Sequence, residues 1–420
     1  MTDYSPTKLE DDDDDHRTTM ARRAAWWLIG GIAALLAIIV VLGLRQPTGE
    51  PGPLTETLYA LPADVPATLL SDVSSIWGLN SWSSTSRSHL SGGVSLGDLD
   101  GDGLDDLVIA GGTVAVFLND GTHFTLVDDP TTLLPSDALS TLIIDLDGPD
   151  SLYSRDAKGQ WTDIARDVGV AMEVDGMGVT VADLTGDGTL DGYVSDLGGN
   201  EFLERVGPGF VSSVESGALR IRPPGADDGI VSSSWGSGAA DVNLDGIIDL
   251  VVVNGGMPFS RVENKISGTL IEVDDPPAIL IGLGDGIYAD AWPSGAIDWT
   301  GAGRGLALGD IDNDGDTDMV ITRLDGSPIL LLNDSTAPAV TVLPLFGCSP
   351  YGAVVSVATT HGTVTQLLGS FSFAGGHAPG VIVGQAVEGS QITVEWPGTG
   401  VAHTLVPSGD RPTVTVDCIE

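Results

Sequence analysis

The sequence predicts an all-β protein built from a repeated unit, on the basis of three observations. A nine-residue acidic loop recurs four times, and a short apolar strand follows each copy at once. Between the loops, a glycine with an aromatic residue close behind it recurs. Short strands rich in β-branched residues and bounded by turn residues are typical of antiparallel sheets. The loops start at residues 98, 183, 241 and 310, a spacing in the range of a propeller blade or a solenoid unit.

The four acidic loops are candidate calcium sites. Each has oxygen-bearing side chains at positions 1, 3, 5 and 9 and a backbone carbonyl at position 7, and hard oxygen ligands on alternate residues suit Ca²⁺. Zinc would need His or Cys, which these loops lack. The expected ligands of about four sites are Asp98, Asp100, Asp102, Leu104 and Asp106; Asp183, Thr185, Asp187, Thr189 and Asp191; Asp241, Asn243, Asp245, Ile247 and Asp249; and Asp310, Asp312, Asp314, Asp316 and Asp318.

These loops differ from an EF-hand, which begins in the same way. An EF-hand needs a bidentate Glu at position 12 and flanking helices, whereas position 12 here is Ile109, Val194, Val252 or Ile321 within an apolar run. The loops are therefore expected to join two strands. The alternative is an acidic, solvated turn without metal, and this is the preferred interpretation for a decayed fifth copy at Asp145.

The signals between the loops predict hairpins and a strand shared between the two ends of the repeat region. The pairs Gly121–Phe124, Gly159–Trp161, Gly209–Phe210 and Gly286–Tyr288 predict returning strands that each pack one ring. Residues 70–79 align without gaps on residues 161–170, and the last unit, 304–333, lacks its own glycine–aromatic strand. We therefore expect residues 68–79 to complete that unit and close a β-propeller, which removes exposed sheet edges. Five blades are recognisable, and the longer units leave room for a sixth or seventh.

The acidic loops, with Gly-Val-Ser-Leu-Gly or Gly-Leu-Ala-Leu-Gly before them, resemble the FG-GAP or VCBS repeats of integrin-type β-propellers over residues 68–335. In that family, the loop between the first two strands of a blade binds Ca²⁺. Residues 336–420 resemble the ASPIC/UnbV domain, through 352–357 and 394–398. That domain accompanies such repeats in cartilage acidic protein and its microbial relatives. The sequence departs from the family's Phe-Gly-Leu-Gly at 381–384, and Trp396 is expected in the core of this small β domain.

The N-terminal region predicts a single-pass membrane anchor. Residues 24–44 carry no charge and are about long enough to cross the roughly 30 Å hydrocarbon layer. Arg17, Arg22 and Arg23 precede this span and Arg45 follows it, so the N-terminus is expected in the cytoplasm and the repeat region outside. Residues 1–23 would form a disordered acidic tail and residues 45–67 a linker. A cleaved signal peptide, giving a secreted protein, is the alternative.

Charge and composition narrow the function. A net charge of -42 excludes a nucleic-acid-binding role, because phosphates would be repelled. No catalytic motif is recognisable, and His377, in a glycine-rich turn, is expected to be exposed and idle. The prediction is a binding or adhesion protein whose partner is an unknown extracellular protein or glycan. A polysaccharide-processing enzyme and a structural envelope protein are the alternatives.

The two cysteines, Cys348 and Cys418, bracket the C-terminal domain. An oxidising compartment favours a disulfide between them, and two buried free thiols are the alternative.

Overall fold

The computed structural model describes residues 58–65, 69–83, 93–110, 114–127, 152–155, 161–171, 176–213, 215–219, 232–256, 262–263, 270–271, 275–292, 297, 299, 301–324, 326–345, 352–396 and 400–417. The predicted tail, membrane span, both cysteines and the loop at Asp145 lie outside these residues. Residues 56–420 belong to one compact unit. Among the described residues, no helix has the length and hydropathy that crossing a bilayer requires.

The described residues are almost entirely strand, which confirms the all-β prediction. Two short helices occur among them, η1 (Leu79–Ser81) and α2 (Ala165–Val168). Each acidic loop joins the first two strands of an antiparallel group of four, as the sequence predicts. The groups, called the first to fourth sheets after their loops, consist of β2 (Gly93–Gly97), β3 (Asp106–Ala110), β4 (Val114–Asn119) and β5 (Phe124–Leu126); β8 (Gly176–Ala182), β9 (Asp191–Asp196), β10 (Glu201–Val206) and β11 (Gly209–Ser212); β12 (Ser234–Ala240), β13 (Asp249–Asn254), β16 (Ala278–Gly282) and β17 (Tyr288–Asp290); and β18 (Gly303–Gly309), β19 (Asp318–Arg323), β20 (Ile329–Asn333) and β1 (Leu70–Asp72).

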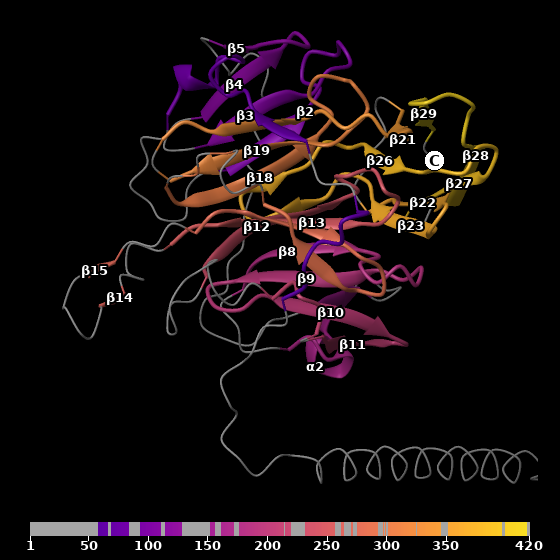
Figure 1. Ribbon diagram of the computed structural model, residues 1–420. Coiled ribbons are helices and arrows are strands. Elements are labelled where there is room, and N and C mark those ends of the chain that lie inside the picture. Colours follow the sequence, from indigo (N-terminus) through magenta and orange to yellow (C-terminus); the bar gives the residue numbers. More distant parts are fainter. Residues whose placement is uncertain are drawn as a thin grey trace, which may run out of the picture. The chain divides into compact units, whose positions relative to one another are not determined.

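The first strands of the four sheets lie side by side in the order β2, β18, β12 and β8 (Figure 1). Glycines let these strands approach closely, since a Cβ on Gly236 of β12 would lie only 2.9 Å from the Leu306 nitrogen of β18. Two further strand pairs, β6 (Tyr153–Arg155) with β7 (Trp161–Asp163) and β14 (Val262–Glu263) with β15 (Leu270–Ile271), complete this part of the chain.

The predicted strand exchange is confirmed. β1 pairs antiparallel with β20, with Leu70 opposite Asn333, and so forms the outer strand of the fourth sheet. The alignment of residues 70–79 on 161–170 also holds in three dimensions. Asp72 and Asp163 each accept a hydrogen bond from the backbone N–H two residues later, at 3.0 Å in both cases. Gly78 and Gly169 then follow with the same left-handed φ, 86° and 85°.

The glycine–aromatic signals also mark returning strands. Phe124 on β5 and Tyr288 on β17 are buried, and each ring packs against a second aromatic ring. Phe210 on β11 is only partly buried, with the Arg205 guanidinium 5.9 Å from its ring centre. The prediction of one packed ring per hairpin is therefore confirmed for Phe124 and Tyr288.

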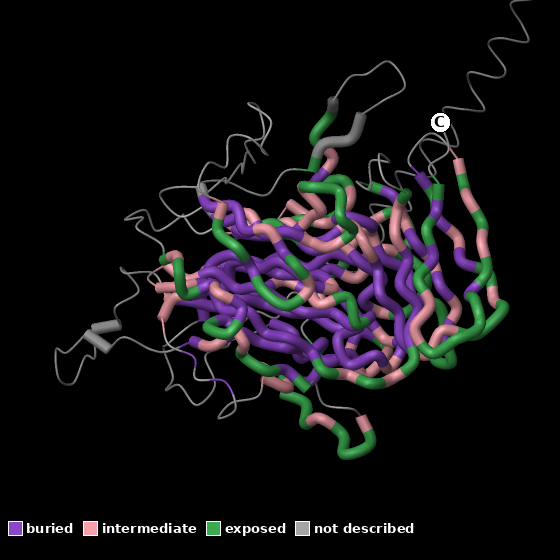
Figure 2. Tube along the Cα trace, turned by 90° about the horizontal axis from the view of Figure 1, so that it is seen from above, coloured by how far each residue is buried: buried purple, intermediate pink, exposed green. Residues whose placement is uncertain are grey.

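The C-terminal strands share a hydrophobic core with the repeat region. In β22 and β27 every second side chain is buried, as their alternating sequences predict, and Trp396 is buried as expected. Their core also includes residues of the second and third sheets, and exposed chain lies mainly in turns (Figure 2). The strands are β21 (Ala339–Pro344), β26 (Val381–Gly384) and β29 (Thr413–Val416); β22 (Val354–Thr359), β23 (Gly362–Leu367), β27 (Gln391–Trp396) and β28 (Gly400–Leu405); and β24 (Phe371–Ser372) with β25 (Gly375–Gly376).

The short hairpin β24–β25 inserts among the first strands of the four sheets. β25 pairs parallel with β2, and the Ala378 N–H just after it donates to the Leu308 carbonyl of β18 at 2.8 Å. The Ser372 hydroxyl oxygen accepts a hydrogen bond from the Ser237 N–H of β12 at 3.1 Å. A Cβ on Gly375 would overlap the Leu306 carbonyl oxygen, so only glycine fits that close approach.

Candidate metal loops

All four acidic loops have the same backbone conformation. Position 6 is a glycine in each loop, with φ of 90°, 88°, 85° and 89° at Gly103, Gly188, Gly246 and Gly315. Position 4 is also left-handed, at Gly101, Gly186, Leu244 and Asn313. Leucine and asparagine adopt this conformation at a steric cost that glycine avoids. The third and fourth loops therefore keep a left-handed residue that its own side chain disfavours. The conformation is therefore a property of the loop as a whole and not of its glycines alone.

The first aspartate of each loop organises the turn through its carboxylate. In the second loop, Asp183 accepts hydrogen bonds from the N–H groups of Gly186, Asp187 and Gly188, at 2.8 to 3.0 Å. Asp98, Asp241 and Asp310 accept from the equivalent N–H groups at positions 5 and 6. The aspartate at position 5 in turn accepts from the N–H at position 7 in every loop.

The ninth aspartate begins the second strand and ties the loop to its sheet. Asp106 accepts the Leu99 N–H with one oxygen and the Asn119 N–H of β4 with the other, both at 2.8 Å. Asp191, Asp249 and Asp318 accept the equivalent pair of N–H groups from position 2 and from the third strand. All four are fully buried, so the hydrogen bonds offset the desolvation of each carboxylate.

The structure brings three predicted ligands together in each of two loops. Carboxylate oxygens of Asp98, Asp100 and Asp106 lie within 4.8 Å of one another, as do those of Asp310, Asp312 and Asp314. The second and third loops have Thr185 and Asn243 at position 3 and so carry one carboxylate fewer. The Thr185 hydroxyl donates to Asp191 at 3.0 Å, and the Asn243 amide donates to Asp245 at 2.9 Å.

The crowded carboxylates resist ionisation. Burial, reinforced by neighbouring aspartates, raises the pKa of Asp183, Asp310 and Asp312 to about 6 and that of Asp241 to about 7. In the fourth loop, Asp312 Oδ1 and both carboxylate oxygens of Asp316 are buried without a hydrogen-bond partner. A cation would relieve both the repulsion and the unmet lone pairs. The donor set is entirely oxygen, so the residues fit Ca²⁺ better than zinc.

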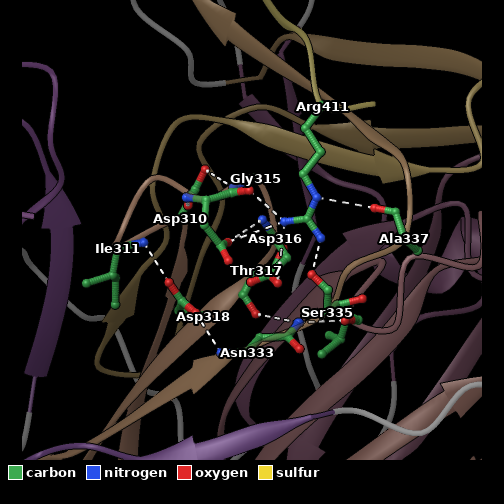
Figure 3. Close-up of polar contacts among 12 residues, drawn as sticks. Asp310, Ile311, Gly315, Asp316, Thr317, Asp318, Asn333, Ser335, Ala337 and Arg411 are labelled. Carbon is green, nitrogen blue, oxygen red and sulfur yellow. Dashed lines mark hydrogen bonds and ion pairs between the residues drawn. The ribbon is translucent and has the colours of Figure 1, made fainter. Parts of the chain in front are cut away.

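Arg411, from the turn between β28 and β29, lies against the fourth loop (Figure 3). Its Nη1 donates to the Asp314 carbonyl at 2.6 Å and lies 3.5 Å from Asp314 Oδ1 and 3.7 Å from Asp316 Oδ2. The same guanidinium donates to the carbonyls of Ser335 and Ala337 in the connection between the fourth sheet and β21. One side chain thus links a candidate metal loop to the C-terminal strands.

The C-terminal strands also cover the third loop. The Gly384 N–H of β26 donates to Asp241 at 2.8 Å, and the Thr359 hydroxyl of β22 donates to the Gly246 carbonyl at 3.2 Å. Asp241 and Asn243 are consequently buried. The first and second loops, in contrast, expose their middle residues, including Asp102 and Asp187. The four loops therefore share one geometry but differ in their access to solvent.

Side chains from the neighbouring sheet hold three of the loops, a feature that sequence analysis missed. Asn119 of the first sheet donates to the Ile311 carbonyl of the fourth loop at 2.8 Å. Asn333 of the fourth sheet donates to the Val242 carbonyl of the third loop at 2.7 Å, and Tyr288 of the third sheet donates to the Leu184 carbonyl of the second at 2.8 Å. Position 2 is the acceptor each time. The recurring Leu-Asn at the end of β4 and β20 was the available signal.

The prediction that His377 is exposed is wrong, since the residue is partly buried. Its Nδ1 accepts the Leu308 N–H of β18 at 3.1 Å, and its Nε2 lies 3.3 Å from the Ser237 carbonyl of β12. These contacts require the neutral ring with hydrogen on Nε2, and burial lowers the pKa of His377 to about 4. The imidazole therefore joins two strands that the sequence does not bring together.

Comparisons with known proteins assign no family. No family model and no curated protein sequence matches the chain. One similar solved structure, of an Agrocybe aegerita lectin, concerns recognition of non-reducing terminal N-acetylglucosamine; it is 18% identical, with a TM-score of 0.25, and the match covers 59% of this chain and 68% of that one. The rhamnogalacturonan lyase YesW is 14% identical, with a TM-score of 0.18, over 85% of this chain and 68% of its own. At such TM-scores neither likeness bears on the function of this chain.

Proposed function

We propose that this protein is a calcium-stabilised, propeller-type scaffold that binds an extracellular protein or glycan ligand at a cell surface. The observation that carries the proposal is the fourfold repetition of one loop geometry. The loops have the same φ angles, the same carboxylate-to-backbone hydrogen bonds and oxygen donors at the same offsets. Calcium held by four such loops would fix the turns at one end of the sheets, and binding proteins present their contact residues on such fixed turns.

The order of the sheets supports a propeller. Their first strands adjoin in the order β2, β18, β12 and β8, and β1 brings the start of the repeat region to its last sheet. The pair β6–β7 would belong to a fifth blade between the first and second sheets. The uncharged segment 24–44 would anchor this ectodomain with the N-terminus in the cytoplasm, or would be cleaved to give a secreted protein.

The residues between the first strands of the four sheets favour a binding role over catalysis. The hairpin β24–β25 lies between the first strands, where a propeller enzyme would place its substrate. His377, the imidazole in this region, is already hydrogen-bonded to two backbone groups. Most loop carboxylates likewise accept backbone N–H groups, which suits a structural role better than general acid–base chemistry.

Calcium dependence tests the proposal directly. Each occupied site should stabilise the fold by about 2.7 kcal/mol at a hundredfold excess of Ca²⁺ over its dissociation constant. Magnesium should substitute poorly, because it demands tighter octahedral geometry. Melting of residues 56–420 should therefore shift upward with Ca²⁺ and return on chelation, and Asp187→Ala should reduce the shift. A melting temperature that changes with neither calcium nor chelator would refute the metal assignment.

Glycan and protein arrays probed with and without calcium would then identify the ligand, and cleavage of a glycan by the protein would refute the binding role.

A further inference from the structure

A cavity of about 400 Å³ lies between the first loop, the fourth loop and the C-terminal strands. Its volume is at the small end of the range for small-molecule pockets. Its lining includes the acidic residues Asp98, Asp105 and Asp310. The lining also includes the apolar residues Leu308, Leu343, Val381 and Ile382. A cavity lined by apolar side chains together with acidic ones is suited to a ligand of positive charge with an apolar body.

Asp105 is the informative residue of this cavity. It stands at position 8 of the first loop, outside the set of predicted calcium ligands. Its carboxylate is enclosed by protein and packs against the fourth sheet, where a Cβ added to Gly309 would lie 3.1 Å from Asp105 Oδ2. Unlike the carboxylates at positions 1 and 9, it accepts no hydrogen bond and forms no ion pair with any described residue. The residue is partly exposed and lines the cavity.

The potential at Asp105 is negative whether or not calcium occupies the loops. The first loop carries the carboxylates of Asp98, Asp100, Asp102 and Asp106 beside that of Asp105, and the fourth has four at the same positions and Asp316 at position 7. One Ca²⁺ would offset two of the five carboxylate charges in each loop. An uncompensated, enclosed carboxylate in such surroundings lacks a positive partner.

We propose that this cavity binds a small organic cation, an ammonium group on an apolar stem, with the ammonium at Asp105 and the stem against Leu308, Leu343 and Ile382. Asp105 lies outside the predicted calcium ligands, although Asp98 and Asp310 of two metal loops also line the cavity, and the amine does not require these loops to hold calcium. Two sources supply this chemistry, a free alkylamine and a lysine side chain of a peptide. A divalent metal bridging the two loops is the competing occupant.

Titration calorimetry on the full-length protein distinguishes these cases. The probes are pentylammonium, the Nα-acetyl methylamide of lysine, the neutral pentanol and Ca²⁺ itself, each titrated with calcium-saturated and with chelated protein. Pentylammonium should bind in both states, and pentanol should bind at least about tenfold more weakly, since a charge-assisted contact is roughly twice as strong as a neutral one. Equal binding of lysine methylamide would indicate a peptide side chain as the source, and binding of pentylammonium alone would indicate a free amine.

Two variants test the assignment to Asp105. Asp105→Asn keeps the shape of the side chain and removes its charge. The variant should fold, because Asp105 forms no hydrogen bond with a described residue, and it should bind pentylammonium at least about tenfold more weakly. Glu388→Gln, which removes the same charge from an exposed turn, should leave binding unchanged. Leu345→Trp should also weaken binding, because Leu345 lines the cavity and is 43% exposed, so a larger ring can enter without disturbing the core.

Three outcomes would overturn the proposal. They are the absence of binding by every amine, equal pentylammonium affinity for the wild type and Asp105→Asn, and an extra calcium site that disappears in Asp105→Asn while amines do not bind. If Asp105→Asn failed to fold, unchanged affinity in Leu345→Trp would overturn the proposal instead. Loss of the calcium-dependent melting shift with intact amine binding would count against the proposed metal loops and leave the cavity assignment standing.

Discussion

Replacing Arg411 by methionine should uncouple the fourth loop from the C-terminal strands. Methionine keeps the apolar stem but removes the guanidinium, which donates to the carbonyls of Asp314, Ser335 and Ala337 and lies 3.7 Å from Asp316 Oδ2. Asp316 is buried without another partner, and burial with repulsion from Asp314 already raises its pKa to about 8. Loss of Arg411 therefore leaves a buried carboxylate with no nearby cation.

The magnitude follows from these contacts. Hydrogen bonds to a charged group contribute about 1.5–3 kcal/mol each in net terms, and breaking a buried ion pair costs about 3–5 kcal/mol. The Arg411 side chain is 19% exposed and that of Asp314 is 41% exposed, so solvent screens part of this interaction. We expect Arg411→Met to lower the free energy of unfolding by about 2–3 kcal/mol in chelator. With calcium the loss should be about 1 kcal/mol, because bound metal would already offset the carboxylate repulsion.

Urea denaturation with and without calcium measures both values, and hydrogen exchange at residues 335–337 reports the local effect. Arg205→Met is the matched control, since Arg205 is exposed and its guanidinium lies 5.9 Å from the centre of the Phe210 ring, and it should change stability by less than about 0.5 kcal/mol. An equal loss with and without calcium would refute the coupling between metal and Arg411. A loss no larger than that of the control would refute the structural role itself.

Three further predictions concern protons, packing and oxidation. In chelator, stability should fall as pH rises from about 5 to about 8, because the folded-state pKa values of Asp241 and Asp316, about 7 and 8, exceed the unfolded value of 3.8, so the folded state retains protons that the unfolded state has lost. Saturating calcium should flatten this dependence, and a rise in stability with pH in chelator would contradict the reasoning. Gly375→Ala should destabilise the fold by about 1–3 kcal/mol, since its Cβ would overlap the Leu306 carbonyl, whereas Gly97→Ala, with open space around the added carbon, should be tolerated; equal melting of the two variants would argue against the inserted hairpin. Mass analysis after alkylation without reductant should find Cys348 and Cys418 unlabelled, because β21 and β29 run parallel and end with Pro344 beside Val416; the bridge should stabilise by about 4 kcal/mol, and two labelled thiols would exclude it.

The features predicted correctly from sequence are those encoded by short-range patterns. The strand–loop–strand units follow from carboxylates at fixed offsets and from a glycine that accepts a left-handed φ. The exchange of β1 into the fourth sheet followed from a gap-free internal alignment together with the missing strand of the last unit. Both signals depend on residue type at defined spacing, so one sequence is enough to detect them.

The features missed depend on contacts between distant backbone segments. Gly384 reaches Asp241 through a backbone N–H, which every residue except proline possesses, so no residue type predicts that contact. The hairpin β24–β25 is short and glycine-rich, without the alternation that predicts a strand. His377 was misjudged for the same reason, since a glycine-rich turn predicts exposure unless other sheets surround it. The packing of the C-terminal strands against the loops therefore could not be predicted from residue types at short spacing.

The pairing of β1 with β20 has a consequence for biosynthesis. Leu70 is made early in translation, but its partner Asn333 follows about 260 residues later. During that interval the first strand has no native partner, and the fourth sheet cannot be completed on a partly synthesised chain. Pairing over so long a separation is slow, because the loop must close before the contacts form. An unpaired strand also invites association with other chains. Shortening the chain from its C-terminal side before residue 333 should therefore leave a product that aggregates, and release of the whole repeat region sets the earliest time at which the fold can close.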